Sequence, residues 1–178
     1  MFGMALTGYN QKYLRRNGGL KSIALADIDS VESAVTDQGR NAWAGIALKD
    51  GKKFAVYDFY EDEAEYRENV YVKNGNITVV HELSFTLDRM GGETSVAVGA
   101  LCNAARNGLA AIVTTANDDT FLVGYSRKFR NECPLRLSSA KGNTGSKLAG
   151  TTGETIVLRG EDTSKALPYT GSLAGITA

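Results

Sequence analysis

Alternation of apolar and polar side chains is clearest over residues 77–87. One face of this stretch carries mostly apolar residues: Ile77, Val79, His81, Leu83, Phe85 and Leu87. A two-residue period of this length predicts a β-strand of about 36 Å, well beyond the usual length of roughly 17–20 Å. The preceding Asn74-Gly75 is the preferred sequence of a two-residue hairpin turn. Residues 70–73 are therefore predicted to pair with this strand in a long hairpin.

A helical period follows the strand. Between Gly92 and Gly108, small and apolar residues recur at spacings of three and four: Val96, Ala97, Ala100, Leu101, Ala104 and Ala105. This stripe predicts a helix over residues 93–107, with Thr94 or Ser95 as its N-cap and Gly108 as its stop. A lone helix of this length is marginal in water, so its apolar stripe must pack on a sheet.

The remaining pattern predicts short strands joined by turns. Residues 109–126 form a second hairpin around a polar turn at 117–119, and residues 43–48 pair with 53–59 around Asp50-Gly51. The segment that ends at Gly39 has only a weak pattern of apolar and polar residues. Further strands are expected at residues 20–26, at the start of 134–148, and at 155–159.

These elements predict a single domain over residues 1–178. It is mainly β with one α-helix: an antiparallel β-sandwich or half-barrel of about eight strands, with the helix packed on the sheet and a long hairpin. Residues 66–125 form its hairpin-helix-hairpin core. Residues 1–19 are predicted to be an N-terminal arm and residues 160–178 a C-terminal tail, both poorly ordered on their own.

The charges balance over the whole chain. The 178 residues contain 20 Lys and Arg and 20 Asp and Glu, which argues against a surface that binds nucleic acid or acidic membrane everywhere. No apolar run reaches the roughly 20 residues of a membrane span, and residues 1–7 lack the charged start of a signal peptide. We expect a soluble chain that is made in the cytoplasm and does not bind membranes. Neither of its two cysteines demands a disulfide.

The balance hides two segments of opposite charge. Residues 58–68 carry a net −5, from six carboxylates against Arg67: Asp58, Glu61, Asp62, Glu63, Glu65 and Glu68. Residues 127–147 carry a net +5, from six cations against Glu132: Arg127, Lys128, Arg130, Arg136, Lys141 and Lys147. Each can be a solvated surface. Alternatively, they are opposite ends of one subunit that meet head to tail, and such contacts generate rings or filaments.

Residues that could carry catalysis are few. His81 is the only histidine, and its place among apolar residues favours a hydrogen-bonded, half-buried role over that of a general base. One histidine and two distant cysteines do not make a zinc site. Residues 142–147 fail the phosphate-loop spacing because Ser146 separates Gly145 from Lys147. The carboxylates of 58–68 form one polar run that lacks the groove of a glycosidase. We therefore expect no enzymatic activity and no cofactor.

Nucleic-acid binding is the alternative function. Tyr125 and Phe129 lie beside the cations of residues 127–147, and aromatic rings next to cations can stack on bases. This pattern describes a sequence-nonspecific nucleic-acid-binding β-module. The neutral net charge and the equal acidic segment weigh against it.

The layout resembles virion structural proteins of tailed bacteriophages. The resemblance rests on the hairpin at Asn74-Gly75, the long strand, the single helix, and the motifs Phe121-Leu-Val-Gly-Tyr-Ser126, Pro134-Leu-Arg-Leu-Ser138 and Gly153-Glu-Thr-Ile-Val-Leu158. It covers roughly residues 66–160 and is nearest to tail-tube or neck-ring subunits, as in phages of Bacteroidetes hosts. It implies a β-sandwich flanked by a helix that assembles, usually as hexamers, into a ring of the virion whose bore passes DNA.

The resemblance also implies partners and surfaces. The partners would be further copies of the chain, adjacent tail or neck proteins and, in transit, DNA. A bore that releases DNA should be acidic or neutral, because each cation that pairs with a phosphate adds affinity. The six carboxylates of 58–68 are accordingly the candidates for the bore or the ring interface. The six cations of 127–147 are the candidates for contacts between rings.

Overall fold

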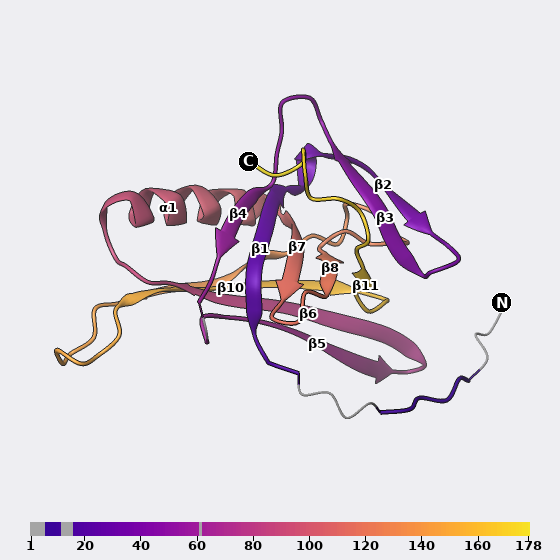
Figure 1. Ribbon diagram of the computed structural model, residues 1–178, viewed down its shortest axis with the longest axis horizontal. Coiled ribbons are helices and arrows are strands. Elements are labelled where there is room, and N and C mark those ends of the chain that lie inside the picture. The colour runs from indigo at the N-terminus through magenta and orange to yellow at the C-terminus, as the bar shows by residue number, and fades with distance from the viewer. Residues whose placement is uncertain (1–5, 12–15, 61) are drawn as a thin grey trace.

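The computed structural model describes residues 6–11, 16–60 and 62–178. These residues form eleven β-strands in three antiparallel sheets, one α-helix and one 3-10 helix (Figure 1). The predicted fold class, mainly β with one helix and a sandwich of antiparallel sheets, is confirmed. The strands outnumber the eight or so that the sequence predicts, and those that escape the periodicity are the two-residue strand Leu167–Pro168 and the weakly patterned strand Val31–Asp37.

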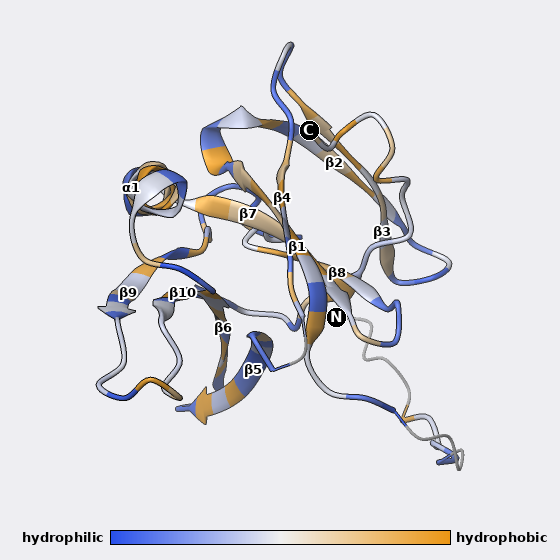
Figure 2. Ribbon diagram, turned by 60° about the vertical axis from the view of Figure 1, so that its left-hand side comes forward, coloured by the Kyte–Doolittle hydropathy of each residue, from blue (hydrophilic) through white to orange (hydrophobic). Residues whose placement is uncertain are grey.

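A five-stranded sheet lies at the centre of the molecule. Its strands, from edge to edge, are β11 (Leu167–Pro168), β8 (Thr120–Val123), β7 (Leu109–Thr115), β1 (Leu20–Asp27) and β4 (Ala55–Asp58). The first five residues of β7 are all buried, because both faces of this sheet are covered. A continuous apolar run is the pattern expected of such a strand, and it shows as the apolar colour of β7 in Figure 2.

A four-stranded sheet packs on one face of the central sheet. Its order is β5 (Ala64–Lys73), β6 (Asn76–Leu87), β10 (Gly153–Asp162) and β9 (Arg136–Asn143). The predicted long hairpin is confirmed as β5 and β6. Asn74 and Gly75 at its turn have φ of 52° and 77°, the left-handed conformations that a type I′ turn requires.

The main core lies between these two sheets. Phe85 and Leu83 of β6 meet Ile23 of β1 there, and α1 (Gly92–Asn107) closes one end with its buried Val98 and Leu101. The predicted helix and its stop at Gly108 are confirmed. Its predicted cap is wrong: the N-cap is Gly91, with no side-chain hydrogen bond.

A second core covers the opposite face of the central sheet. It is built on the hairpin of β2 (Val31–Asp37) and β3 (Ala42–Leu48), which follows the 3-10 helix η1 (Ile28–Ser30). The predicted pairing of residues 43–48 with 53–59 is therefore wrong. β3 pairs with β2, whose weak pattern hid it, and β4 pairs with β1. Asp50-Gly51 makes only a loop turn, in which Lys52 N–H donates to the Lys49 carbonyl at 3.0 Å.

Described residues of both predicted extensions contact the rest of the domain. Tyr169 is buried in the second core, and Phe54 exchanges backbone hydrogen bonds with Ile176 and Ala178 at 2.8 and 2.9 Å. The C-terminal tail is thus part of the packed structure. In the N-terminal arm, whose residues 1–5 and 12–15 lie outside the described part, Asn17 is joined to Asn117 by two hydrogen bonds.

Candidate assembly surface

The four-stranded sheet exposes two long edges. β5 and β9 are its outer strands, and no further described strand pairs with either of them. β5 extends over 10 residues and β9 over 8. Folded proteins usually shorten or cover such edges, because their unpaired N–H and C=O groups invite another strand. These edges are therefore places where a second chain can add.

The end of the β5–β6 hairpin adds exposed apolar surface to the β5 edge. Val70, Tyr71 and Val72 are 49%, 57% and 69% exposed, and Ile77 across the turn is 51% exposed. Their alternation indicates strands, but the sequence alone does not reveal that both faces are left open. An exposed apolar edge of this kind is typical of an interaction site.

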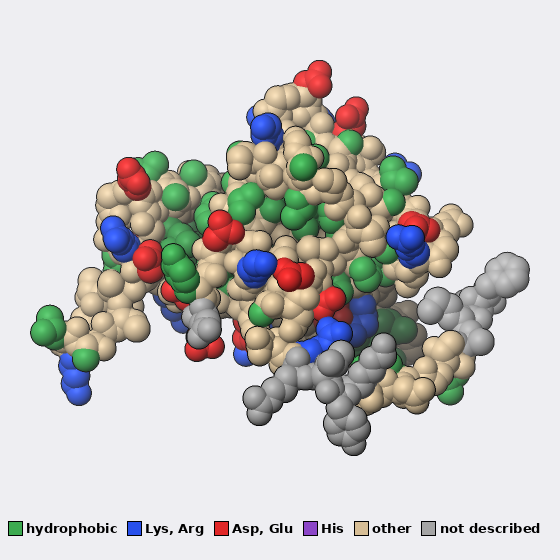
Figure 3. Space-filling view, in the orientation of Figure 1, with side chains coloured by type: hydrophobic (Ala, Val, Ile, Leu, Met, Phe, Trp, Pro, Cys, Tyr) green, Lys and Arg blue, Asp and Glu red, His purple; other side chains and the backbone are tan. Residues whose placement is uncertain are grey.

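The outward face of the same sheet carries mixed charge. Burial alternates along β5 and β6, so that Glu65, Arg67 and Glu82 point away from the core. Arg67 lies 2.7 Å from Glu65, and Arg159 lies 3.5 Å from Glu161 on β10. Acidic and basic side chains are also interspersed on the face that Figure 3 shows.

The acidic candidates do not gather on one surface. Asp58 ends β4, while Asp62 and Glu63 lie in the connection to β5. Glu65 lies on the outward face of the four-stranded sheet, whereas Glu68 points inward and its side chain is only 22% exposed. Glu61 lies outside the described residues. Glu68 differs from the other acidic candidates, because its carboxylate takes part in an internal polar cluster.

The basic candidates divide among three places. Three of them lie on one short turn after β8: Arg127, Lys128 and Arg130. Arg136 and Lys141 lie on the edge strand β9, and Lys147 lies in the exposed β9–β10 connection. They do not form one continuous track.

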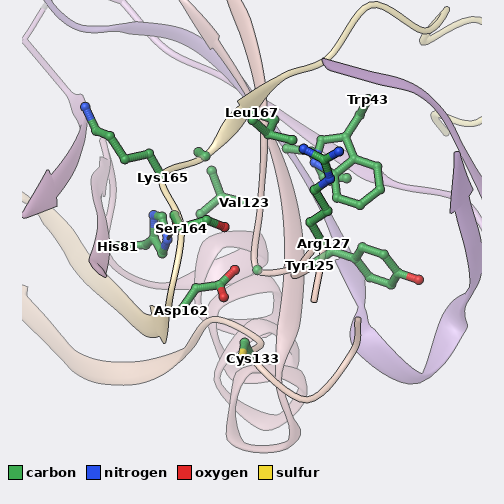
Figure 4. A pocket seen from close by; sticks show the side chains of 13 residues that line it. Trp43, His81, Val123, Tyr125, Arg127, Cys133, Asp162, Ser164, Lys165 and Leu167 are labelled. Atoms are coloured by element: carbon green, nitrogen blue, oxygen red, sulfur yellow. Dashed lines mark hydrogen bonds between the residues drawn. The ribbon is translucent and has the colours of Figure 1, made fainter. Parts of the chain in front are cut away.

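The internal cluster is centred on His81, the predicted hydrogen-bonded histidine. The ring is 5% exposed. Its Nδ1 lies 2.7 Å from the Tyr66 hydroxyl, and its Nε2 lies 3.2 Å from the Ser164 carbonyl oxygen. The carboxylate of Glu68 lies 3.3 Å from the Tyr66 hydroxyl oxygen, accepts from Ala166 N–H at 3.0 Å and pairs with Lys165 at 2.9 Å. Figure 4 shows His81 beside Ser164 and Lys165.

The contacts of the two ring nitrogens of His81 fit one neutral tautomer. If Nε2 of His81 donates to the Ser164 carbonyl, Nδ1 accepts from the Tyr66 hydroxyl. Burial lowers the pKa of His81, and the Glu68 carboxylate opposes that effect. Burial also raises the pKa of Tyr66, and Glu68 raises it further. The lowered pKa favours the neutral form of His81, and the cluster joins β5, β6 and the β10–β11 connection.

A cavity beside the cluster brings His81, Asp162 and Cys133 together. Its free volume is about 10 Å³, roughly the space of one water molecule. Burial raises the pKa of the Cys133 thiol, the opposite of what activates a nucleophile. This cavity has no room for a substrate.

The described residues lack two further arrangements. No group of three or more His, Cys, Asp or Glu side chains is placed to hold a metal ion. In the same part of the chain, no helix has both the length and the apolar composition that crossing a membrane would need.

The comparisons with known proteins give no relative. The chain matches no protein-family model, no curated protein and no solved structure.

Proposed function

We propose that this chain is a ring-forming structural subunit, of the kind found in the tail tube or neck of a tailed bacteriophage. The observation that supports it best is the pair of long, open edges, β5 and β9, on one four-stranded sheet. The two strands run in opposite directions, because each neighbouring pair in the sheet is antiparallel. Adding β9 of one copy to β5 of the next therefore continues the antiparallel pattern.

Repetition of this contact closes a ring. The contact is heterologous, and such contacts form rings when the rotation closes. Six copies of a four-stranded sheet would make a barrel of 24 strands with a backbone diameter of roughly 37 Å before tilt. Barrels of roughly 16 or more strands leave an aqueous channel. Pairing of every edge would also remove the aggregation hazard that the open edges present.

The outward face of the sheet would then line the bore. It carries carboxylates next to guanidinium groups, such as Glu65 with Arg67 and Glu161 with Arg159. Paired cations of this kind are less available to phosphates than free ones. A near-neutral lining suits a conduit that lets DNA pass.

Edge-blocking variants test the proposal. Val70→Lys with Val72→Lys places two lysines on the β5 edge, a device by which natural edges avoid pairing. Ser138→Pro changes β9 at a register shift. Leu137 and Ser139 have partners on β10 there, whereas Ser138 has none, so the proline leaves the pairing of β9 with β10 intact. We expect wild-type rings and monomeric variants in sedimentation velocity and negative-stain microscopy.

A matched control separates edge pairing from loss of surface apolarity. Val96 on α1 is 74% exposed and belongs to neither edge strand, so Val96→Lys should leave rings intact. Rings that persist in the β5 and β9 variants at wild-type concentration would overturn the proposal.

A further inference from the structure

The turn after β8 is held in one rigid conformation. Ser126, which is 1% exposed, accepts from the backbone N–H groups of Lys128 and Phe129 at 3.2 and 3.1 Å and donates to Asp162 at 2.8 Å. Ser126 and Arg130 also exchange two backbone hydrogen bonds, at 2.7 and 2.9 Å. Arg130 adopts φ of 54°, a conformation that costs free energy for a residue other than glycine. The turn thereby presents its cations in a fixed arrangement.

These cations border a groove. It has a volume of about 450 Å³ and lies between the turn and the β2–β3 hairpin. Among the described residues that line it, only Arg127 and Arg130 are charged. Trp43 and Tyr125 supply aromatic walls whose rings meet edge to face at 5.5 Å. Figure 4 shows Arg127 and Trp43 on the same side of the neighbouring cavity. None of the ion pairs among the described residues uses either arginine, although Arg127 donates to Asn41 at 2.9 Å.

The opposite end of the central sheet carries a complementary projection. Tyr60 is 87% exposed in the β4–β5 connection, and the exposed carboxylates Asp58 and Asp62 flank it. The connection is anchored, because Tyr60 N–H donates to the Glu63 carboxylate at 3.2 Å and Phe59 N–H donates to the Lys21 carbonyl at 3.0 Å. The two described cations nearby are engaged elsewhere: Arg16 with Asp119 at 3.0 Å and Lys21 with Asp118 at 2.8 Å.

The groove and the projection cannot meet within one subunit. Asp58 pairs with Ser22 near the start of β1. Val123, just before the basic turn, pairs with Ala111, which in turn pairs with Leu25 near the end of β1. The two features therefore lie at opposite ends of the central sheet, whose strand β1 spans about 26 Å over its 8 residues. They can meet only between copies that are arranged head to tail.

We infer that Tyr60 and its flanking carboxylates dock into the arginine groove of a second copy, in the next ring of a stack. This inference rests on the proposed function and adds a second contact to it. Guanidinium groups form short, charge-assisted bonds with carboxylates, and a tyrosine inserted in a pocket is a common anchor of protein interfaces. The contact is open-ended, so it lengthens a stack instead of closing it. Part of its strength is electrostatic and falls as salt rises.

Charge reversal at each end tests the inference. Arg127→Glu with Arg130→Glu, and separately Asp58→Lys with Asp62→Lys, should each raise the concentration needed for stacking at least tenfold while single rings still form. An equimolar mixture of the two variants should stack again, because each reversed end then meets its complement. Lys52→Glu with Lys53→Glu, on the exposed β3–β4 loop outside the groove, is the matched control and should stack as wild type. Thermal melting verifies that every variant is folded.

The possible outcomes separate this inference from the proposed function. Stacks that form normally in both reversed variants, or a mixture that fails to stack, overturn the docking contact and leave the ring intact. Folded Arg127→Glu/Arg130→Glu protein without rings would assign the groove to the ring contact and overturn the axial one. A wild-type chain that forms no rings overturns both. A single-stranded oligonucleotide that binds wild type but not this variant, with stacking unaffected, would assign the groove to nucleic acid.

Discussion

The Tyr66 hydroxyl lies 2.7 Å from Nδ1 of His81, and the two side chains stack with their rings 7° from parallel. Tyr66 belongs to the edge strand β5 and His81 to its neighbour β6. The hydrogen bond therefore holds the edge strand β5 to β6 on the face of the sheet that points toward the core. A well-ordered β5 is what an incoming strand would need as a template.

Removal of the Tyr66 hydroxyl should destabilise the fold. Tyr66→Phe leaves Nδ1 of the buried His81 without its partner, so we expect the free energy of unfolding to fall by about 1–2 kcal/mol in urea denaturation. A double-mutant cycle with His81→Leu isolates the pair. Strictly additive losses would show that the two side chains do not interact.

The stability of the protein should depend on the charge state of His81. Burial lowers the pKa of His81 in the folded chain, whereas the unfolded chain restores it to about 6.5. Between these two values the unfolded state binds more protons, so the free energy of unfolding rises with pH there. We expect stability to fall as the pH is lowered through about 6.5, and this contribution to stop changing below the folded-state pKa.

The variant His81→Gln isolates this effect, because glutamine stays neutral and can still hydrogen bond. Its unfolding free energy should change less between pH 7 and pH 5 than that of the wild type. The charged groups around the ring, Glu68, Asp162 and Lys165, are the same in both proteins and cancel in the comparison. Equal slopes would contradict a role for His81.

Gly124 should not tolerate a side chain. It has φ of 80°, and a Cβ atom added there would lie 2.4 Å from the Leu109 carbonyl oxygen. We expect Gly124→Ala to destabilise the fold by about 2–4 kcal/mol, through backbone strain and overpacking. Gly99 is the matched control: it lies within α1 with open space around it, so Gly99→Ala should stabilise by up to about 1 kcal/mol. Thermal melting compares the two variants. Equal changes in melting temperature would contradict the claim that position 124 does not tolerate a side chain.

Tyr169 should anchor the C-terminal tail. Its side chain is 4% exposed and packs in the second core. Tyr169→Ala should therefore cost about 3–5 kcal/mol of unfolding free energy, as large aromatic-to-alanine changes in cores do, and should free the tail for limited proteolysis. Tyr9, 89% exposed in the arm, provides the control, since Tyr9→Ala should change neither property.

Local pattern was enough to predict the elements whose partners follow directly in the chain. The turn at Asn74-Gly75 joins two adjacent strands, and Gly108 ends a helix that carries a regular apolar stripe. Both depend on short-range backbone preferences. The pairing of residues 43–48 failed because Asp50-Gly51 offers a plausible turn, whereas the chosen partners, β2 for β3 and β1 for β4, are decided by covering the central sheet on both faces.

The same distinction applies to the candidate surface. The sequence indicated two segments of opposite charge, and the structure places part of each at opposite ends of the central sheet. The sequence could not show that the Glu68 side chain turns inward, because the side chains that it contacts, Tyr66 and Lys165, come from different elements. Nor could it show the groove at Arg127 and Arg130, which depends on the distant hairpin of β2 and β3.

The most direct test of ring assembly is the oligomeric state of the wild-type chain in solution. Sedimentation velocity over a concentration series, followed by negative-stain class averages, measures both mass and symmetry. The account predicts a discrete oligomer, a whole-number multiple of the subunit mass, that appears as a closed ring with a central channel. A chain that stays monomeric at every concentration and salt level would contradict it.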